Sequence, residues 1–104
     1  MPYIIITFCV YDPHLGEKVA EKYLKLLQKL PVPDYIKRLV PAASAASEKG
    51  IEVINVDEVK RDKLGDAIDY EGKFMIEFRD IEGFRWETRV FSTVAEGLSY
   101  IGMG

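Results

Sequence analysis

Cysteine and histidine are almost absent from this chain, in which Cys9 and His14 are the only residues of their kinds. A lone cysteine cannot close an internal disulfide, which fits a reducing compartment. One thiol and one imidazole fall short of the four ligands of a zinc site unless carboxylates from elsewhere contribute. No Walker loop, dinucleotide-binding fingerprint or nucleophile elbow appears either. The sequence therefore predicts a protein without a metal or other cofactor.

Long apolar runs and runs of one charge sign are missing as well. The 14 basic and 17 acidic residues are interspersed and give a net charge of −3, so nucleic-acid binding has little electrostatic support. The longest strongly apolar stretch, residues 3–11, is far too short to cross a bilayer, and the first residues lack the features of a signal peptide. We therefore expect a cytoplasmic protein that binds neither nucleic acid nor membrane.

The composition that is present is typical of a globular protein. Hydrophobic residues make up 48% of the 104 residues and charged residues 30%, which supplies apolar material for one modest core. A chain of this length buries roughly two-thirds of the surface that its unfolded state exposes. We expect residues 1–104 to form a single domain.

Residues 3–11 are β-branched and aromatic and predict a first strand. Alternate residues of a strand point to opposite faces of the sheet. One face is purely apolar and is expected to meet the helices; it holds Ile4, Ile6, Phe8 and Val10. The other face is mixed and holds Tyr3, Ile5, Thr7, Cys9 and Tyr11.

A first helix is predicted between Asp12-Pro13 and Pro31, because apolar residues recur there at spacings of three and four. Asp12 is expected to cap it, and Pro31 to end it. Residues 35–47 are ambiguous, since their first half is typical of a strand and residues 41–47 could be either strand or a short helix opening at Pro41. We favour a strand, and the proline predicts that it lies at an edge of the sheet.

Residues 51–60 predict another strand, with valine and isoleucine spaced among polar residues. Asp62 is expected to cap a second helix, and Gly83 to end it. Residues 74–76 taken alone would suggest a strand. Helical spacing from Leu64 onward covers more residues, so we favour a helix.

Residues 84–92 predict the last strand. Thr93 and Glu96 form a capping box, which predicts a short final helix over residues 94–101. The resulting order is β-α-β-β-α-β with a short C-terminal helix. That order predicts an α+β protein with a ferredoxin-like, antiparallel four-stranded sheet.

With this order, the chain resembles the ferredoxin-like domains that assemble as dimeric α+β barrels. The similarity is strongest in GIEVINVDEVKRDKLGDA, residues 50–67, where a strand runs through a basic turn into an amphipathic helix. DIEGFRWETRVF, residues 80–91, resembles the return into the last strand. The resemblance implies two sheets that face each other in a dimer, and a pocket between each sheet and its own helices. Such domains include cofactor-independent oxygenases, haem-degrading enzymes and proteins of no known activity, so the function stays open.

Two side chains are candidates for catalysis. His14 follows the end of a strand and could serve as an acid or base, and Tyr11 lies just before it. No partner of His14 is evident from sequence spacing, and a solvated surface histidine is the more frequent outcome. The sequence therefore leaves open whether the protein is an enzyme.

The candidates for ligand binding are Thr7, Cys9, Asn55, Asp57 and Trp86. Cys9 could also be a nucleophile, although a lone cysteine on an apolar strand is more often inert. Asn55 and Asp57 share one face of their strand, where they could line a pocket, bond across a dimer interface or be solvated. Trp86 could wall an apolar pocket or anchor a subunit contact, but core packing is more common.

We expect a homodimer or a higher homo-oligomer, because a sheet with helices on one face leaves its other face to be covered. That open face is expected to include Ile5, Cys9, Ile51 and Val53. One hypothesis is a homodimeric module that binds a small, partly apolar molecule or performs cofactor-independent chemistry on it. The small residues 42–47 could leave space for that molecule. The alternative is a non-catalytic structural or regulatory interaction domain.

Overall fold

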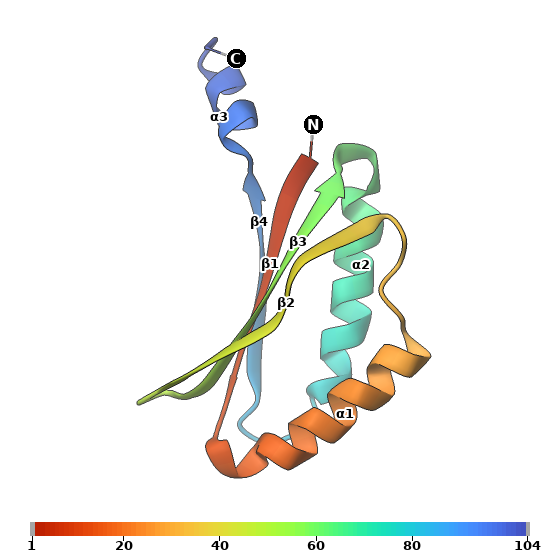
Figure 1. The fold of residues 1–104 in the computed structure, drawn as a ribbon, viewed down its shortest axis with the longest axis vertical. Coiled ribbons are helices and arrows are strands. Elements are labelled where there is room, and N and C mark those ends of the chain that lie inside the picture. Colours follow the sequence, from red (N-terminus) through yellow and green to blue (C-terminus); the bar gives the residue numbers. More distant parts are fainter. Residues whose placement is uncertain (1, 104) are drawn as a thin grey trace.

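A four-stranded antiparallel sheet and two helices on one of its faces form the body of the protein (Figure 1). The structure is a computed structural model that describes residues 2–103. Its strands are β1 (Pro2–Tyr11), β2 (Ile36–Ser47), β3 (Gly50–Lys60) and β4 (Arg85–Ser92). Its helices are α1 (Gly16–Lys29), α2 (Leu64–Met75) and α3 (Val94–Tyr100), with 3-10 turns at Pro13–Leu15, Arg61–Lys63 and Ile76–Phe78. The predicted ferredoxin-like β-α-β-β-α-β order with a short C-terminal helix is confirmed.

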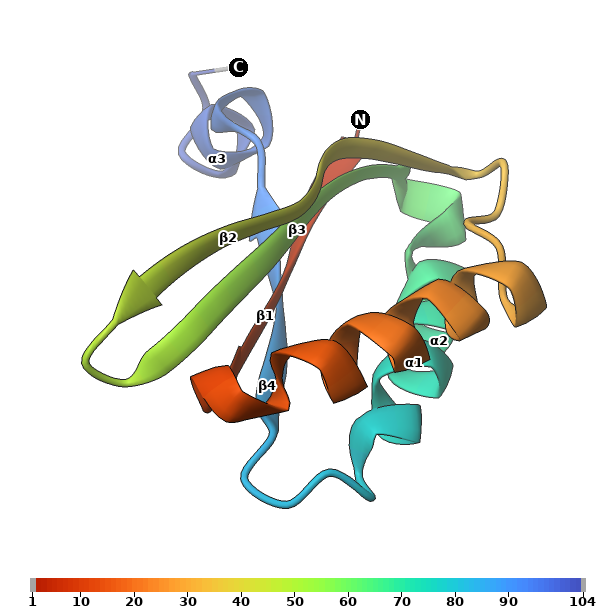
Figure 2. The same ribbon diagram turned by 60° about the horizontal axis from the view of Figure 1, so that its bottom comes forward.

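The strands lie in the order β2-β3-β1-β4, and each neighbouring pair is antiparallel. β2 is therefore an edge strand, as predicted, and residues 41–47 belong to it. The helices α1 and α2 cover one face of the sheet, while no element of residues 2–103 forms a layer over the other face (Figures 1 and 2). The core lies between the covered face and these helices and includes Ile5, Leu26, Val59 and Phe74.

The prediction for the two faces of β1 is wrong, because the strand turns its mixed face to the helices. Ile5 and Thr7 are buried there, at 0% and 2% exposure. The open face instead carries the apolar set that was expected to meet the helices: Ile4, Ile6, Phe8 and Val10. The strand pairing also puts Ile51 and Val53 opposite Tyr11 and Cys9, on the covered face. Both faces of β1 are apolar, so alternation alone did not decide which one meets the helices.

A bulge interrupts the middle of β2. The register of β2 against β3 shifts between Arg38 and Val40 and again between Val40 and Ala43, around Pro41. Ala42 has a φ of +43°, in the left-handed region that residues other than glycine rarely adopt. Its backbone N–H donates to the side-chain oxygen of Asn55 at 2.6 Å. The Asn55 side chain therefore holds the strained residue in place.

The helix boundaries differ from the predictions in three places. Asp12 precedes a 3-10 turn and makes no side-chain cap, and α1 begins only at Gly16. Asp62 lies inside a 3-10 turn and does not cap α2. Gly83 lies in the loop before β4 with a φ of +86°, well beyond the end of α2. Thr93 caps α3 as predicted, since its side chain accepts a hydrogen bond from the backbone N–H of Glu96.

Two segments extend away from the body. The tip of the β2–β3 hairpin projects beyond the helices (Figure 2), and α3 continues past the end of the sheet (Figure 1). The segment around α3 exposes apolar side chains, with Val94 at 79%, Ile101 at 70% and Met103 at 70%. Among residues 2–103, no helix is long and apolar enough to cross a membrane.

Candidate functional site

A pocket of about 170 Å³ lies between the covered face of the sheet and the two helices. β1, β2 and β3 form its floor, α1 and α2 form its roof, and the loop before β4 closes one side. Its walls are mainly apolar and aromatic. The lining residues are Thr7, Cys9, Tyr11, Val19, Ala20, Tyr23, Ala42, Ser44, Val53, Asn55, Phe74, Met75, Phe78 and Phe84.

The pocket exists because small residues lie where larger ones would fill the space. Ala42 and Ser44 lie on β2, in the small-residue stretch singled out above, and Ala20 lies on α1. Aromatic rings brace the rest of the wall. Phe78 stacks on Phe84 with ring centroids 4.7 Å apart, and Phe84 in turn stacks on Tyr11 at 6.0 Å. These stacked rings give the pocket a fixed apolar wall.

The polar groups of the pocket come chiefly from two neighbouring strands. Thr7 on β1 and Asn55 on β3 are directly opposite each other in the sheet. Directly opposite residues of an antiparallel pair have Cβ atoms about 4.5–5.5 Å apart. Ser44 on β2 adds a hydroxyl at the rim. One small group in the pocket can therefore reach both Thr7 and Asn55.

Behind Thr7 lies a buried ionic cluster. Arg38 of β2 binds Asp57 of β3 through two hydrogen bonds, from Nε to Oδ1 at 2.8 Å and from Nη2 to Oδ2 at 3.0 Å. The same Nη2 donates to Glu71 Oε1 on α2 at 3.1 Å. The Thr7 hydroxyl donates to Glu71 Oε2 at 3.1 Å. The cluster thus ties three strands and a helix together and ends at Thr7, which lines the pocket.

The charges of this cluster are almost fully removed from water. The Asp57 and Glu71 side chains are 1% and 3% exposed, and the Arg38 side chain is 13% exposed. Burial, with the neighbouring Asp57 carboxylate, raises the pKa of Glu71 to about 7, although Arg38 and Thr7 act in the other direction. Burial also disfavours the guanidinium, but Asp57 and Glu71 outweigh it and hold the pKa of Arg38 above its ordinary value. One cation therefore faces two carboxyl groups, and the proton on Glu71 sets the net charge.

Two ionisable groups on the pocket wall, Cys9 and Tyr11, stay protonated near neutral pH. Burial raises the pKa of the Cys9 thiol to about 11, so the nucleophilic thiolate is scarce. Burial also raises the pKa of Tyr11. Both side chains therefore present neutral groups to a ligand.

The structure brings together four of the seven residues that the sequence singled out. Thr7, Cys9, Tyr11 and Asn55 all line the pocket. Asp57 faces the same side of the sheet, but its carboxylate is buried and binds Arg38. The alternative that Asp57 is solvated is therefore wrong.

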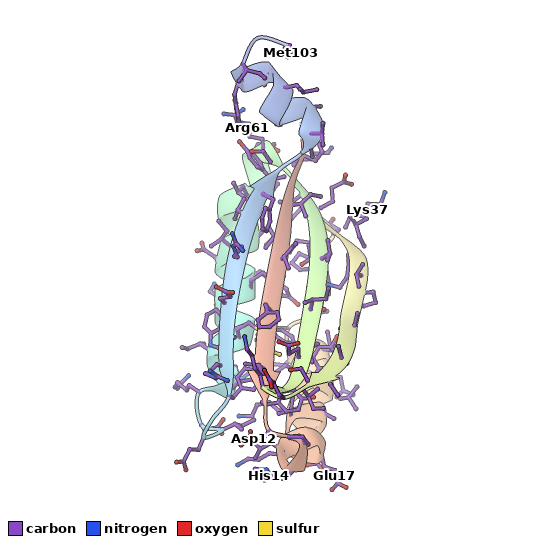
Figure 3. The ribbon with its side chains drawn as sticks, turned by 90° about the vertical axis from the view of Figure 1, so that its left-hand side faces the viewer. Asp12, His14, Glu17, Lys37, Arg61 and Met103 are labelled. Carbon is purple, nitrogen blue, oxygen red and sulfur yellow. The ribbon has the colours of Figure 1, made fainter. Side chains whose placement is uncertain are left out.

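The other two candidates lie outside the pocket lining. His14 is exposed in the turn at the end of the molecule, next to Asp12 and Glu17 (Figure 3). Trp86 lies opposite Cys9 on the edge strand β4, is 36% exposed and does not line the pocket. Neither side chain is therefore positioned to contact a ligand bound in the pocket.

Sequence reasoning missed Arg38 and Glu71. Their contact joins residues 33 positions apart, which no local pattern shows. One signal for Glu71 was present, because it falls four residues after Ala67 and three before Phe74, both in the buried stripe of α2. A charged residue on a buried helical stripe needs a partner, and Arg38 supplies it.

The part of the chain that the structure describes contains no cluster of metal-binding side chains. Among residues 2–103, no three His, Cys, Asp or Glu side chains gather closely enough to hold a metal ion. The two buried carboxylates that do approach each other, Asp57 and Glu71, use oxygens of both groups to bind Arg38.

Comparison with known proteins supports the fold alone. No family model matches the chain, and no curated protein matches it. Among solved structures, an uncharacterized NIPSNAP-like domain protein from Burkholderia xenovorans superposes with a TM-score of 0.54 at 12% identity, covering 88% of this chain and 86% of that one. The de novo designed protein Foldit4 superposes with a TM-score of 0.57 at 8% identity, covering 88% and 97%. With the strand order described above, these matches show that the chain has a ferredoxin-like α+β fold.

Proposed function

We propose that this protein is a homodimeric module that binds a small, mainly apolar molecule between its sheet and its helices. The observation that carries the proposal is the pocket itself, an apolar, aromatic-walled space into which polar groups of two strands converge. Binding sites for small molecules share this character, an apolar lining with a few placed polar groups.

The size of the pocket restricts the ligand. Sites for drug-sized ligands measure roughly 300–1,000 Å³. An apolar cavity of about 150 Å³ accommodates benzene. At about 170 Å³, this pocket fits a molecule with one ring or a short branched chain.

Binding is better supported than catalysis. An acid or base in the pocket would need a pKa near the working pH, and the pKa values of Cys9 and Tyr11 are raised away from it. Glu71 has a suitable pKa, but Thr7 lies between it and the pocket. His14 lies elsewhere.

The open face of the sheet supports the homodimer. Its centre is a continuous apolar strip of half-buried residues on β1 and β3, made of Ile4, Ile6, Phe8, Ile54 and Val56. Charged residues border the strip: Glu52 and Glu58 lie at its ends on β3, and Arg85, Glu87 and Arg89 alternate in sign along β4. A second copy of this chain presents the same apolar strip and would cover this one across a two-fold interface.

The alternative function is a non-catalytic interaction domain without a ligand. The observation that favours it is the apolar surface around α3, where Val94, Ile101 and Met103 are each at least 70% exposed. An exposed patch of this kind marks contact surfaces between proteins. In this case the pocket would stay empty while the sheet face and α3 carried the contacts.

A ligand titration with two matched variants tests the binding proposal. Toluene is titrated into the protein and followed by amide chemical shifts, with Ser44→Leu as the variant that fills the pocket and Ala46→Leu as its control. Both residues lie on β2 and are exposed, but only Ser44 lines the pocket. We expect saturable shifts that Ser44→Leu abolishes and Ala46→Leu preserves.

Native mass spectrometry of protein from its own source separates the two functions. A dimer that retains a small molecule supports the binding module. A dimer without one, together with no response to toluene, supports the interaction domain instead.

A further inference from the structure

We infer that the ligand carries a hydroxyl group on its apolar body, held between Thr7 and Asn55. This inference rests on the proposed function and specifies the chemistry of the same pocket. It follows from which hydrogen-bonding atoms of these two residues are already occupied.

The hydroxyl proton of Thr7 is committed to the ionic cluster. At pH 8.5 Glu71 is mostly ionised and can only accept, so Thr7 Oγ1 donates to Glu71 Oε2 at 3.1 Å. A threonine hydroxyl has a single proton and two acceptor sites. Thr7 lines the pocket, so the group that it offers to a ligand there is an acceptor.

The oxygen of Asn55 is committed to the bulge of β2. The backbone N–H of Ala42 can only donate, so the Asn55 atom 2.6 Å away is the amide oxygen. The side-chain nitrogen of Asn55 has no hydrogen-bond partner within residues 2–103. Asn55 lines the pocket, so a ligand there can lie beside this nitrogen. Asn55 therefore offers a donor.

One ligand hydroxyl satisfies both groups together. Thr7 and Asn55 are opposite each other in the sheet, on the face that the helices cover. A hydroxyl can donate its proton to Thr7 while it accepts from Asn55. An ether or a carboxylate can only accept and leaves Thr7 without a donor, and a hydrocarbon satisfies neither residue.

The rest of the pocket defines the body of this ligand. Its aromatic wall of Tyr11, Phe78 and Phe84 suits a single ring. A carboxylate on that ring would lie near buried Glu71 and face only the acceptor side of Thr7. We therefore assign a neutral, one-ring molecule with one hydroxyl group.

Phenol and toluene test this assignment, because they are alike in size and differ in the hydroxyl. Affinities are measured by the same chemical-shift titration at pH 8.5, where Glu71 is mostly ionised. We expect the wild-type protein to bind phenol at least as tightly as toluene. Burying a hydroxyl without hydrogen-bond partners is costly, so a pocket that lacked such partners would prefer toluene. A preference of the wild-type protein for toluene overturns the inference.

Two substitutions at Thr7 identify the group responsible. In Thr7→Val, which keeps the shape and removes the hydroxyl, the ratio of phenol to toluene affinity should fall about tenfold. Thr7→Ser keeps the hydroxyl and should keep the ratio within about threefold of the wild type. An unchanged ratio in Thr7→Val, or an equal loss in Thr7→Ser, overturns the inference. If Thr7→Val does not fold, the wild-type preference still decides.

The outcomes of these titrations also distinguish failure of the hydroxyl assignment from failure of the proposed function on which it rests. If neither probe binds the wild-type protein, the pocket is not a binding site and the proposed function fails. If toluene binds, Ser44→Leu abolishes its binding and toluene is preferred over phenol, the proposed function stands and only the hydroxyl assignment fails.

Discussion

Replacing Glu71 by glutamine should change how the stability of the protein depends on pH. Glu71 is 2% exposed, and burial beside Asp57 raises its pKa from the ordinary 4.5 to about 7. In the unfolded chain this carboxyl returns to its ordinary value. Between these two values the folded state binds more protons than the unfolded state, so the contribution of Glu71 to stability falls as the pH rises.

The magnitude follows from the size of the shift. Each unit of pKa difference is worth about 1.4 kcal/mol, so Glu71 costs the protein roughly 3 kcal/mol between pH 4.5 and pH 7. The loss is complete above about pH 7, where the carboxyl is ionised in both states. Glutamine keeps the shape and the acceptor for Arg38 but carries no titratable proton.

Urea denaturation at half-unit steps from pH 4.5 to 8.5 measures the effect. We expect the free energy of unfolding of Glu71→Gln, relative to the wild type, to rise by roughly 3 kcal/mol across this range and to level off above pH 7. Carboxyl groups that do not contact Glu71 affect both proteins alike and cancel in the difference. A difference that does not vary with pH would refute the elevated pKa and, with it, the account of the cluster's charge.

Three further predictions concern other parts of the molecule. Asp57→Ala leaves the Arg38 charge buried without its main partner, and the free energy of unfolding in urea should fall by about 3–5 kcal/mol. In the exposed control Lys25→Ala, the free energy of unfolding should change by about 0.5 kcal/mol or less. Phe8→Glu places a charge in the apolar strip of the open face and should convert a dimer into a monomer in sedimentation equilibrium; a wild-type protein that is already monomeric at micromolar concentration would contradict the proposed interface. The Cys9 thiol should react with a disulfide reagent at pH 8 far more slowly than an unfolded control, and equal rates would show that its raised pKa and burial are wrong.

The order of the elements was predictable because each one carries its own local signal. The β-branched run of β1, the three-and-four spacing of α1 and the Thr93 cap of α3 all act within a few residues. Local signals stop at the element boundary. They fixed neither the caps of α1 and α2 nor the position of Gly83, because the turns there use backbone hydrogen bonds in place of the expected side chains.

The orientation of β1 was not predictable in this way. Its two faces are both largely apolar, so hydrophobicity hardly distinguishes them. The difference between them is chemical. Only the face with Thr7 can supply a hydroxyl donor to Glu71, and the pairing with β3 puts that face beside Asn55 and Asp57. The strand residues of the site could be predicted, because alternation places them on shared faces of their strands. Arg38 and Glu71 could not, because they join the site only through the tertiary fold.

The ionic cluster also explains how an edge strand can form one wall of a pocket. Burying three charges adds little to stability and costs desolvation, so the cluster is better understood as a positional constraint. Arg38 holds β2 to β3 and α2 just before the bulge, and Asn55 holds the bulge itself at Ala42. Ser44 follows two residues later at the rim. These two attachments fix the edge strand on either side of Pro41, so buried polar groups hold the part of β2 that lines the pocket.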